Sequence, residues 1–222
     1  MNSILSASAL KFLDLISPEP PEILLEMELL AQERNFPTVG LQAGRAIELI
    51  TTMSGATRAF EFGSGFGYSA YWIACGLPSD GSVVLTDRDQ VELDMARDFL
   101  TRANLSDKAI FEVGEARKIF DSYCEQFDLI LFDHYNQDYL PDFQAIKHKL
   151  LPGGIIIADN AMSGLTVDFE GLISFFDPNS DDPPLNENTI GTANYLLELK
   201  KDPSFKTFVM PLGDGLVVSV RT

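Results

Sequence analysis

The sequence has few cysteines and no long hydrophobic run. Cys75 and Cys124 are the only cysteines among 222 residues, and their spacing fits neither a metal site nor a redox motif. We interpret them as free thiols of a cytoplasmic protein. No apolar run reaches the roughly 18 residues that a membrane span needs. Lys11 and Asp14 interrupt the first apolar stretch, which argues against a signal peptide. We therefore expect a cytoplasmic protein with no membrane partner.

Positive charge is also scarce. Lys and Arg number 16 against 33 Asp and Glu, which gives a formal net charge of −17. A phosphate backbone would be repelled unless a strong basic patch existed, and the longest basic run is Lys200-Lys201. The charge therefore argues against a nucleic-acid partner. Apolar residues make up 45% of the chain, enough for a sizeable core and one soluble domain.

Short β-rich runs alternate with segments of helical spacing, such as Gln90–Asn104. The runs are Arg58–Phe62, Val83–Thr86, Ala109–Val113, Phe127–Phe132 and Gly154–Ala158. This alternation predicts an α/β fold with a parallel sheet and helices on both faces. Near the C-terminus, Phe205–Met210 and Leu216–Val220 flank a connection that contains Asp-Gly, which predicts a closing antiparallel pair.

The predicted single domain, 1–222, has two parts. Residues 1–55 are expected to supply N-terminal helices, Pro20–Glu33 and Ala43–Met53 among them, that cover the rim of the sheet and the site. Residues 56–222 form the cofactor-binding and catalytic core. The Pro-rich segment Phe176–Asn188 is predicted to be a mobile loop on the acceptor side.

A glycine-rich turn follows the first strand, with the sequence Glu61-Phe62-Gly63-Ser64-Gly65-Phe66-Gly67-Tyr68-Ser69. Such a turn lets a ligand approach backbone amides closely, although it also fits a simple strand-to-helix turn. Its Gly-x-Gly-x-Gly spacing differs from the Gly-x-Gly-x-x-Gly of dinucleotide sites. Asp87 ends the second strand, where its carboxylate can accept hydrogen bonds from both ribose hydroxyls. The combination favours an adenosine ligand without pyrophosphate, and S-adenosylmethionine fits best.

Polar residues follow the fourth and fifth strands. Asp133 comes directly after one, and Asp159 with Asn160 after the other. The carboxyl ends of parallel strands share one edge of a sheet, where ligands collect. Two carboxylates and an amide oxygen suit Mg²⁺ better than zinc. The alternative is that Asp159 and Asn160 only form an Asx turn.

These segments carry a family resemblance. Glu61–Ser69, Asp87 and Gly114-Glu115-Ala116 resemble the first three motifs of class I S-adenosylmethionine-dependent methyltransferases. Phe127–Phe143 and Ala158–Gly164 resemble catechol O-methyltransferase and its caffeoyl-coenzyme A relatives. The resemblance runs from about Pro37 to the C-terminus. It implies a Rossmann-like, seven-stranded sheet, parallel except for the last strand, in a protein that commonly forms a homodimer.

The resemblance also implies site residues. Val39 and Gly40 would cover the methionine part of the cofactor, Tyr68 would lie near the sulfonium, and Asp87 would hold the ribose. A buried aromatic is the alternative for Tyr68. The full implied cofactor set is Val39, Gly40, Glu61, Gly63, Gly65, Tyr68, Ser69, Asp87, Glu115, Ala116, Asp133 and His134. The implied metal ligands are Asp133, Asp159 and Asn160, and the candidate catalytic residues are Asp133, His134 and Asn136.

The predicted reaction is a metal-dependent transfer of a methyl group from S-adenosylmethionine to a hydroxyl of a small, catechol-like acceptor. A metal that chelates two adjacent hydroxyls lowers the pKa of the attacking one, and the protein supplies alignment. The chain departs from the family at Asn136, where the resembling enzymes carry a lysine base, because an amide cannot accept the proton. Three hypotheses remain: His134 or a metal-bound water takes the proton, the acceptor is already acidic, or catalysis has been lost.

Two other functions remain open on the sequence alone. One is methylation of a hydroxylated base in tRNA, which the net charge argues against. The other is a protein that binds S-adenosylmethionine without turnover, which Asn136 motivates.

Overall fold

A seven-stranded sheet forms the centre of the computed structural model, which describes residues 5–162, 167–180 and 186–222. The strands are β1 (Arg58–Phe62), β2 (Ser82–Asp87), β3 (Ala109–Val113), β4 (Phe127–Phe132), β5 (Leu150–Ala158), β6 (Phe205–Met210) and β7 (Leu216–Arg221). Their order is β3-β2-β1-β4-β5-β7-β6. Strand β7 runs antiparallel to both neighbours, and the other pairs are parallel. The predicted fold class and closing antiparallel pair are confirmed.

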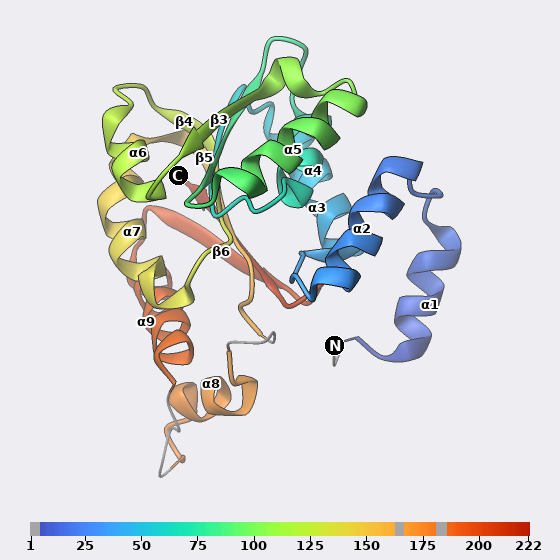
Figure 1. The fold of residues 1–222 in the computed structure, drawn as a ribbon. Helices are drawn as coiled ribbons and strands as arrows, with labels where there is room; N and C mark the ends of the chain where they lie inside the picture. Colours follow the sequence, from blue (N-terminus) through green and yellow to red (C-terminus); the bar gives the residue numbers. More distant parts are fainter. Residues whose placement is uncertain (1–4, 163–166, 181–185) are drawn as a thin grey trace.

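Helices cover both faces of the sheet (Figure 1). They are α1 (Ala7–Ile16), α2 (Glu22–Arg34), α3 (Gly40–Ser54), α4 (Tyr68–Gly76), α5 (Gln90–Arg102), α6 (Ala116–Ser122), α7 (Tyr139–Ile146), α8 (Phe169–Phe176) and α9 (Glu187–Lys201). Successive strand residues point to opposite faces. Leu129 and Leu131 of β4 accordingly pack in the core with α2 to α5, whereas Ile130 and Phe132 pack in the core with α6, α7 and α9.

The N-terminal helices differ from the prediction in one respect. Helices α2 and α3 form within a few residues of the expected bounds, but α1 was not predicted. It lies outside α2, away from the sheet (Figure 1), and it buries none of its residues. The connection between α2 and α3, residues 36–39, reaches the sheet edge and lines the cavity described below.

Two predicted boundaries near the acceptor side were wrong. Strand β5 begins at Leu150 rather than Gly154, with an irregular register opposite Phe127 and Leu129. The predicted loop 176–188 is too long, because α9 begins at Glu187, where the Asn186 side chain accepts a hydrogen bond from the Thr189 amide at 2.7 Å. Residues 181–185 of that loop lie outside the described part of the chain. No helix within the described residues is both long and apolar enough to cross a membrane.

Candidate active site

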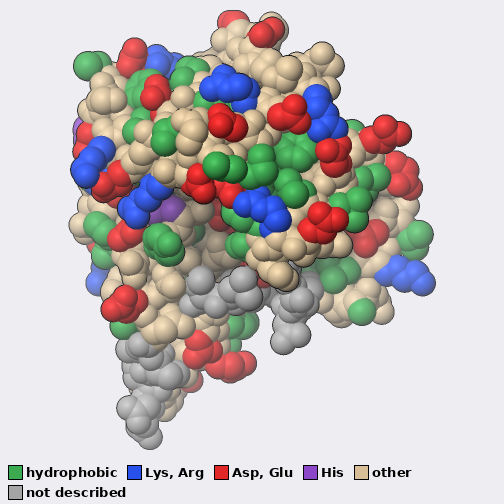
Figure 2. Space-filling view, in the orientation of Figure 1, with side chains coloured by type: hydrophobic (Ala, Val, Ile, Leu, Met, Phe, Trp, Pro, Cys, Tyr) green, Lys and Arg blue, Asp and Glu red, His purple; other side chains and the backbone are tan. Residues whose placement is uncertain are grey.

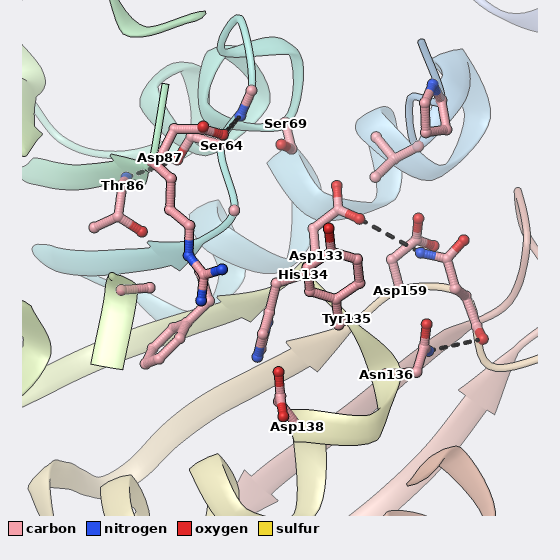
Figure 3. Close-up of a pocket in the computed structure, with 18 of the residues that line it drawn as sticks. Ser64, Ser69, Thr86, Asp87, Asp133, His134, Tyr135, Asn136, Asp138 and Asp159 are labelled. Carbon is pink, nitrogen blue, oxygen red and sulfur yellow. Dashed lines mark hydrogen bonds between the residues drawn. The ribbon is translucent and has the colours of Figure 1, made fainter. Parts of the chain in front are cut away.

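A cavity of about 780 Å³ lies at the carboxyl ends of the strands. Strands β1 and β4 are neighbours at the centre of the sheet, and the chain crosses from β1 to β2 on one side and from β4 to β5 on the other. Ligands of open α/β sheets bind at this kind of switch point. Two sets of residues therefore face each other there, one following β1 to β3 and one following β4 and β5 (Figure 3).

Two glycines of the turn after β1 lie too close to neighbouring groups to carry a side chain. Gly63 has φ +83°, and a Cβ there would lie 2.6 Å from the backbone oxygen of Asp133. Gly65 has φ +48°, and a Cβ there would lie 2.5 Å from the ring of Phe36. Residues with a side chain rarely adopt these conformations, so the turn requires glycine at both positions. The turn is thus pressed between the β4 end and the α2–α3 connection.

Backbone amides of this turn hold Asp87. The carboxylate of Asp87 accepts hydrogen bonds from the amide of Gly65 at 3.0 Å and from the amide of Asp89 at 2.9 Å. The Ser64 hydroxyl accepts a bond from the Thr86 amide at 3.0 Å. A carboxylate oxygen can accept more than one bond, so Asp87 keeps capacity for ligand hydroxyls at the cavity wall. The turn and the β2 end are therefore fixed to each other before a ligand binds.

Glu61 is fully buried beneath the turn, and neither carboxylate oxygen has a hydrogen-bond partner within the described part of the chain. Burial raises the pKa of Glu61 to about 7, while Ser64 and Ser69 lie near enough to oppose the shift without meeting hydrogen-bond geometry. An unpaired buried carboxylate is costly. A cationic ligand group close to Glu61 would offset this cost.

A second group of carboxylates follows β4 and β5. Asp133 and Asp159 lie side by side in Figure 3, and Asn160 donates a hydrogen bond to Asp133 Oδ1 at 3.4 Å. Asp159 is 3% exposed, and its Oδ1 has no hydrogen-bond partner among the residues that the structure describes. Burial raises the pKa of both carboxyls, and the charge of Asp214 in the β6–β7 connection raises them further. Such a crowded set of acids is stabilised by a cation or by protons.

The donor types of this group fit a hard divalent cation. Among the described residues, no three His, Cys, Asp or Glu side chains form a metal-binding group. The predicted site instead combines two carboxylates with an amide, and Asn160 adopts a left-handed backbone with φ +59° that brings its side chain beside Asp133. A flip of that amide would present its oxygen at the same place. Oxygen ligands of this kind suit Mg²⁺.

Asn136 in the β4–α7 connection and Tyr139 at the start of α7 hold this group in place. Asn136 is 2% exposed, and its amide donates to the backbone oxygen of Asn160 at 3.3 Å. The hydroxyl of Tyr139 contacts the backbone oxygens of Phe132 and Asp159, both at 3.2 Å. The residue at the expected lysine position is therefore a buried brace between the ends of β4 and β5.

His134 points away from the acidic group in Figure 3. Its Nε2 lies 2.8 Å from Asp142 Oδ2 in α7, and its ring packs against Phe62, Phe132 and Tyr139. Asp142 holds the ring in one orientation, which leaves the buried Nδ1 as the nitrogen without a partner.

Most of the predicted site residues line the cavity. Those that do are Val39, Gly63, Gly65, Tyr68, Ser69, Asp87, Glu115, Ala116, Asp133, His134, Asn136, Asp159 and Asn160. Gly40 and Glu61 do not: Gly40 begins α3, and Glu61 lies below the turn. The Tyr68 hydroxyl donates to Glu28 of α2 at 2.8 Å, and burial raises its pKa.

Several lining residues were not predicted from the sequence, including Arg88, Tyr135, Asp138, Asn188 and Asp214. Asp214 belongs to the Asp-Gly connection that predicted the hairpin, so it was interpreted only as a turn residue and not as part of the site. No sequence pattern marked Asn188 as a site residue, because it was predicted to lie in a loop and not in the first turn of α9.

The fold and the cavity together define a class I methyltransferase. The family model described as O-methyltransferase matches residues 16–222, so the chain belongs to this family. It is an S-adenosylmethionine-dependent O-methyltransferase, which argues against the alternative of a binding protein without turnover.

Individual relatives agree with this assignment. The chain is 25% identical over 217 residues to caffeoyl-CoA O-methyltransferase 1 of Eucalyptus globulus, covering 93% of this chain and 84% of the relative. Among solved structures, the O-methyltransferase of Bacillus cereus in complex with SAH has a TM-score of 0.79 at 23% identity, covering 97% of each chain. TomG of Streptomyces achromogenes, in complex with SAM, has a TM-score of 0.79 at 21% identity, covering 98% and 96%.

Proposed function

We propose that this O-methyltransferase is metal-dependent and methylates one of two adjacent hydroxyls on a small, catechol-like acceptor. The observation that carries the proposal is the convergence of Asp133, Asp159 and Asn160 at the cavity, with a buried Asp159 oxygen that receives no hydrogen bond from any described residue. Asp133, Asp159 and Asn160 would hold the cation. A bound divalent cation would supply Lewis-acid activation of the acceptor hydroxyl.

The chain's own residues orient the cofactor. Asp87, held by the Gly65 amide, is positioned to accept the ribose hydroxyls. Glu61 lies buried beneath the turn, where an ammonium group of the methionine part would stabilise its ionised carboxylate. Both interactions fix the donor end of the reaction, so the methyl carbon meets the acceptor oxygen from a defined direction.

Asn136 acts as a positioning residue in this proposal. Its amide holds the Asn160 backbone at 3.3 Å and has no basic lone pair to accept the acceptor's proton. His134 is an unfavourable base, because its ring points away from the acidic group (Figure 3) and the nitrogen that Asp142 leaves available, Nδ1, is buried. The proposal therefore relies on an acceptor hydroxyl that is acidic enough to lose its proton to solvent.

A methylation assay with S-adenosylmethionine and a panel of catechols, with Mg²⁺ or with EDTA, tests this function. Methylated product detected by mass spectrometry should appear with Mg²⁺ and disappear with EDTA. Asp133→Asn should lose this activity. Asp138→Asn is the matched control, because Asp138 lines the same cavity but lies outside the proposed ligand set. Full activity in EDTA, or equal activity of the two variants, would refute the metal site.

We also propose that the chain forms a homodimer through its N-terminal helices. Phe12, Leu15 and Ile16 of α1 are 60%, 74% and 62% exposed. Leu25 and Leu29 of α2 add to this apolar surface, and such surfaces mark interaction sites. Analytical ultracentrifugation should give twice the chain mass, and Leu15→Glu should give the monomer mass. A monomer at micromolar concentration in the unaltered protein would refute the dimer.

A further inference from the structure

Two arginine–glutamate pairs join α2 to α5 among the described residues. Arg34, the last residue of α2, donates from both terminal nitrogens to the carboxylate of Glu92 in α5, with Nη1 3.1 Å from Oε2. Arg102, the last residue of α5, donates in the same way to Glu26 of α2. Glu26 precedes Arg34 by about two helical turns, or roughly 12 Å along the axis. Figure 2 shows basic, acidic and hydrophobic side chains intermingled over these two helices.

The two pairs differ in their exposure to water. The side chains of Arg34 and Glu92 are 31% and 10% exposed, whereas those of Arg102 and Glu26 are 44% and 50% exposed. A planar guanidinium that meets both oxygens of a carboxylate forms a strong, well-oriented pair, and partial burial reduces its screening by salt. The Glu92 carboxylate therefore fixes the position of the Arg34 guanidinium.

The guanidinium of Arg34 also lies against two aromatic rings of the cavity wall. Its Cζ is 5.5 Å from the ring centre of Phe36 and 6.0 Å from the ring centre of Phe66. An aromatic ring attracts a cation at such distances. Phe36 belongs to the α2–α3 connection and Phe66 to the glycine-rich turn, and both line the cavity. Arg34 is not itself a lining residue, so it acts on the cavity through these rings.

The two rings hold the α2–α3 connection against the glycine-rich turn. Phe36 and Phe66 meet edge to face, with ring centres 5.1 Å apart. The Phe36 ring also reaches Gly65, where a Cβ would lie 2.5 Å from it. The Gly65 amide in turn donates to Asp87, the proposed ribose ligand. One set of contacts therefore runs from Arg34 to the cofactor end of the cavity.

The path of the α2–α3 connection is set where α2 ends. Asn35 has a left-handed backbone with φ 50°, and the Phe36 amide donates to the backbone oxygen of Ala31 at 2.8 Å. This arrangement ends the helix and turns the chain towards the cavity. Residues 37–39 then line the cavity before α3 begins. Contacts that hold Phe36 therefore decide where these residues lie relative to a bound cofactor.

We propose that Arg34 is a positioning residue for S-adenosylmethionine. Held in place by Glu92, its guanidinium keeps Phe36 against the glycine-rich turn, and the α2–α3 connection thereby stays closed over the cofactor. Without the pair, a smaller fraction of the molecules is closed, and the apparent affinity for the cofactor falls by that fraction. This inference rests on the proposed placement of the cofactor at Asp87, but it is independent of the metal and of the acceptor.

The same substitution in each pair tests the inference. Calorimetry with S-adenosylhomocysteine should give a Kd about tenfold higher for Glu92→Gln than for the unaltered protein, as expected if about a tenth of the molecules stay closed. Glu26→Gln is the matched control, because it weakens the other pair between the same two helices. Its Kd should stay within about twofold of the unaltered value. An unchanged Kd for Glu92→Gln would overturn the inference.

Two variants of Arg34 test the part played by the guanidinium. Arg34→Gln removes the cation and should also raise the Kd about tenfold. Arg34→Lys keeps the charge but lacks the planar fork that meets both the carboxylate and the rings, so it should recover only part of the affinity. Full recovery in the lysine variant would refute the ring contact as the means of positioning.

A purely structural role of the pair predicts a different result. Glu92→Gln would then lower the free energy of unfolding without changing the Kd of the folded protein, and denaturant unfolding of the same samples shows whether the two quantities change together. Hydrogen exchange of the Phe36, Thr38 and Val39 amides, without cofactor, should be faster in Glu92→Gln but not in Glu26→Gln. Unchanged exchange in Glu92→Gln would contradict the opening of the connection.

Asp87→Asn separates failure of this inference from failure of the proposed cofactor placement. Weaker binding of S-adenosylhomocysteine in Asp87→Asn, with unchanged binding in Glu92→Gln, would support the placement and refute the role of Arg34. Weaker binding in Glu92→Gln, with unchanged binding in Asp87→Asn, would refute the ribose contact and support the role of Arg34.

Discussion

The cavity has two halves that are built in different ways: the cofactor half, whose residues follow β1, β2 and β3, and the acceptor half, whose residues follow β4 and β5. The cofactor half is formed largely by backbone, since the glycine-rich turn holds Asp87 through the Gly65 amide and Ser64 through Thr86. The acceptor half is formed by side chains that repel one another, with Asp133 and Asp159 both raised in pKa. Apart from the buried Glu61 below the turn, the polar groups of the first half are hydrogen-bonded before a ligand binds, whereas the second half gains stability from what it binds.

This difference separates the sources of stability and activity. A hydrogen-bonded carboxylate stabilises the fold, and a buried carboxylate without a partner destabilises it. Replacement of each kind of carboxylate by its amide should therefore change the melting temperature in opposite directions.

Asp159→Asn should lower kcat/KM for a catechol by at least about 100-fold, because it removes a proposed metal ligand. The same change should raise the melting temperature, since it removes a buried charge from a repelling pair. Asp128→Asn is the contrasting control. Asp128 accepts bonds from the amides of Thr57 and Arg58 at 2.8 and 2.9 Å, so its loss should lower stability and spare activity. Loss of stability in Asp159→Asn would show that this carboxylate supports the fold.

Gly63→Ala tests a close backbone contact between the two halves. A Cβ at Gly63 would lie 2.6 Å from the Asp133 backbone oxygen, whereas a Cβ at Gly153, with a similar φ of +80°, has no atom within 4 Å. Gly153→Ala should lower the free energy of unfolding by only about 1 kcal/mol, through backbone strain. Gly63→Ala should lower the free energy of unfolding by about 2 kcal/mol more than Gly153→Ala and should also weaken cofactor binding. Denaturant unfolding measures the change in stability, and calorimetry measures the change in cofactor affinity. Equal losses of stability in both variants would show that the close contact between the turn and β4 does not matter for the fold.

Glu61→Gln tests the buried acid below the turn. Because burial raises the pKa of Glu61 from 4.5 to about 7, the folded protein keeps a proton that the unfolded chain has released between these pH values. This contribution to stability is present below pH 4.5 and is lost as the pH rises towards 7.

At pH 8 and without cofactor, Glu61→Gln should therefore be more stable than the unaltered protein by about 2 kcal/mol. Its affinity for S-adenosylmethionine should fall, because the amide cannot balance an ammonium group. Denaturant unfolding from pH 5 to 8 and calorimetry check both. Unchanged affinity would contradict the role of Glu61 towards the cofactor.

The two halves also differ in how much of them the sequence predicts. The turn and Asp87 follow from local rules, since strand, glycine spacing and strand-end acid define the cofactor half within about thirty residues. The strand ends at Asp133 and Asp159 were equally predictable, because parallel strands bring their carboxyl ends together. Local patterns therefore gave the fold and the positions where ligands collect.

What the sequence could not predict depends on contacts between distant segments. Asp214 reaches the acceptor half through the pairing of β7 with β5, and Asn188 through the early start of α9. The engagement of His134 by Asp142 depends on how α7 packs below β4. The brace formed by Asn136 likewise exists only because β4 and β5 are neighbours.

Asn136→Lys should have the smallest effect. It introduces a candidate base into the acceptor half. The position is 2% exposed, so a longer side chain has to extend into the cavity that Asn136 lines. Asn136→Met is the matched control, since it has similar length without charge. We expect about a threefold higher turnover of 4-propylcatechol for the lysine variant than for the methionine variant, with a new ascending limb in the pH–rate profile. The gain is limited because the ammonium group also pairs with Asp133 and Asp159, and because the hydrogen bond to Asn160 is lost. Equal turnover in both variants would mean that proton removal does not limit the reaction, so that a naturally acidic acceptor explains why this chain retains an amide there.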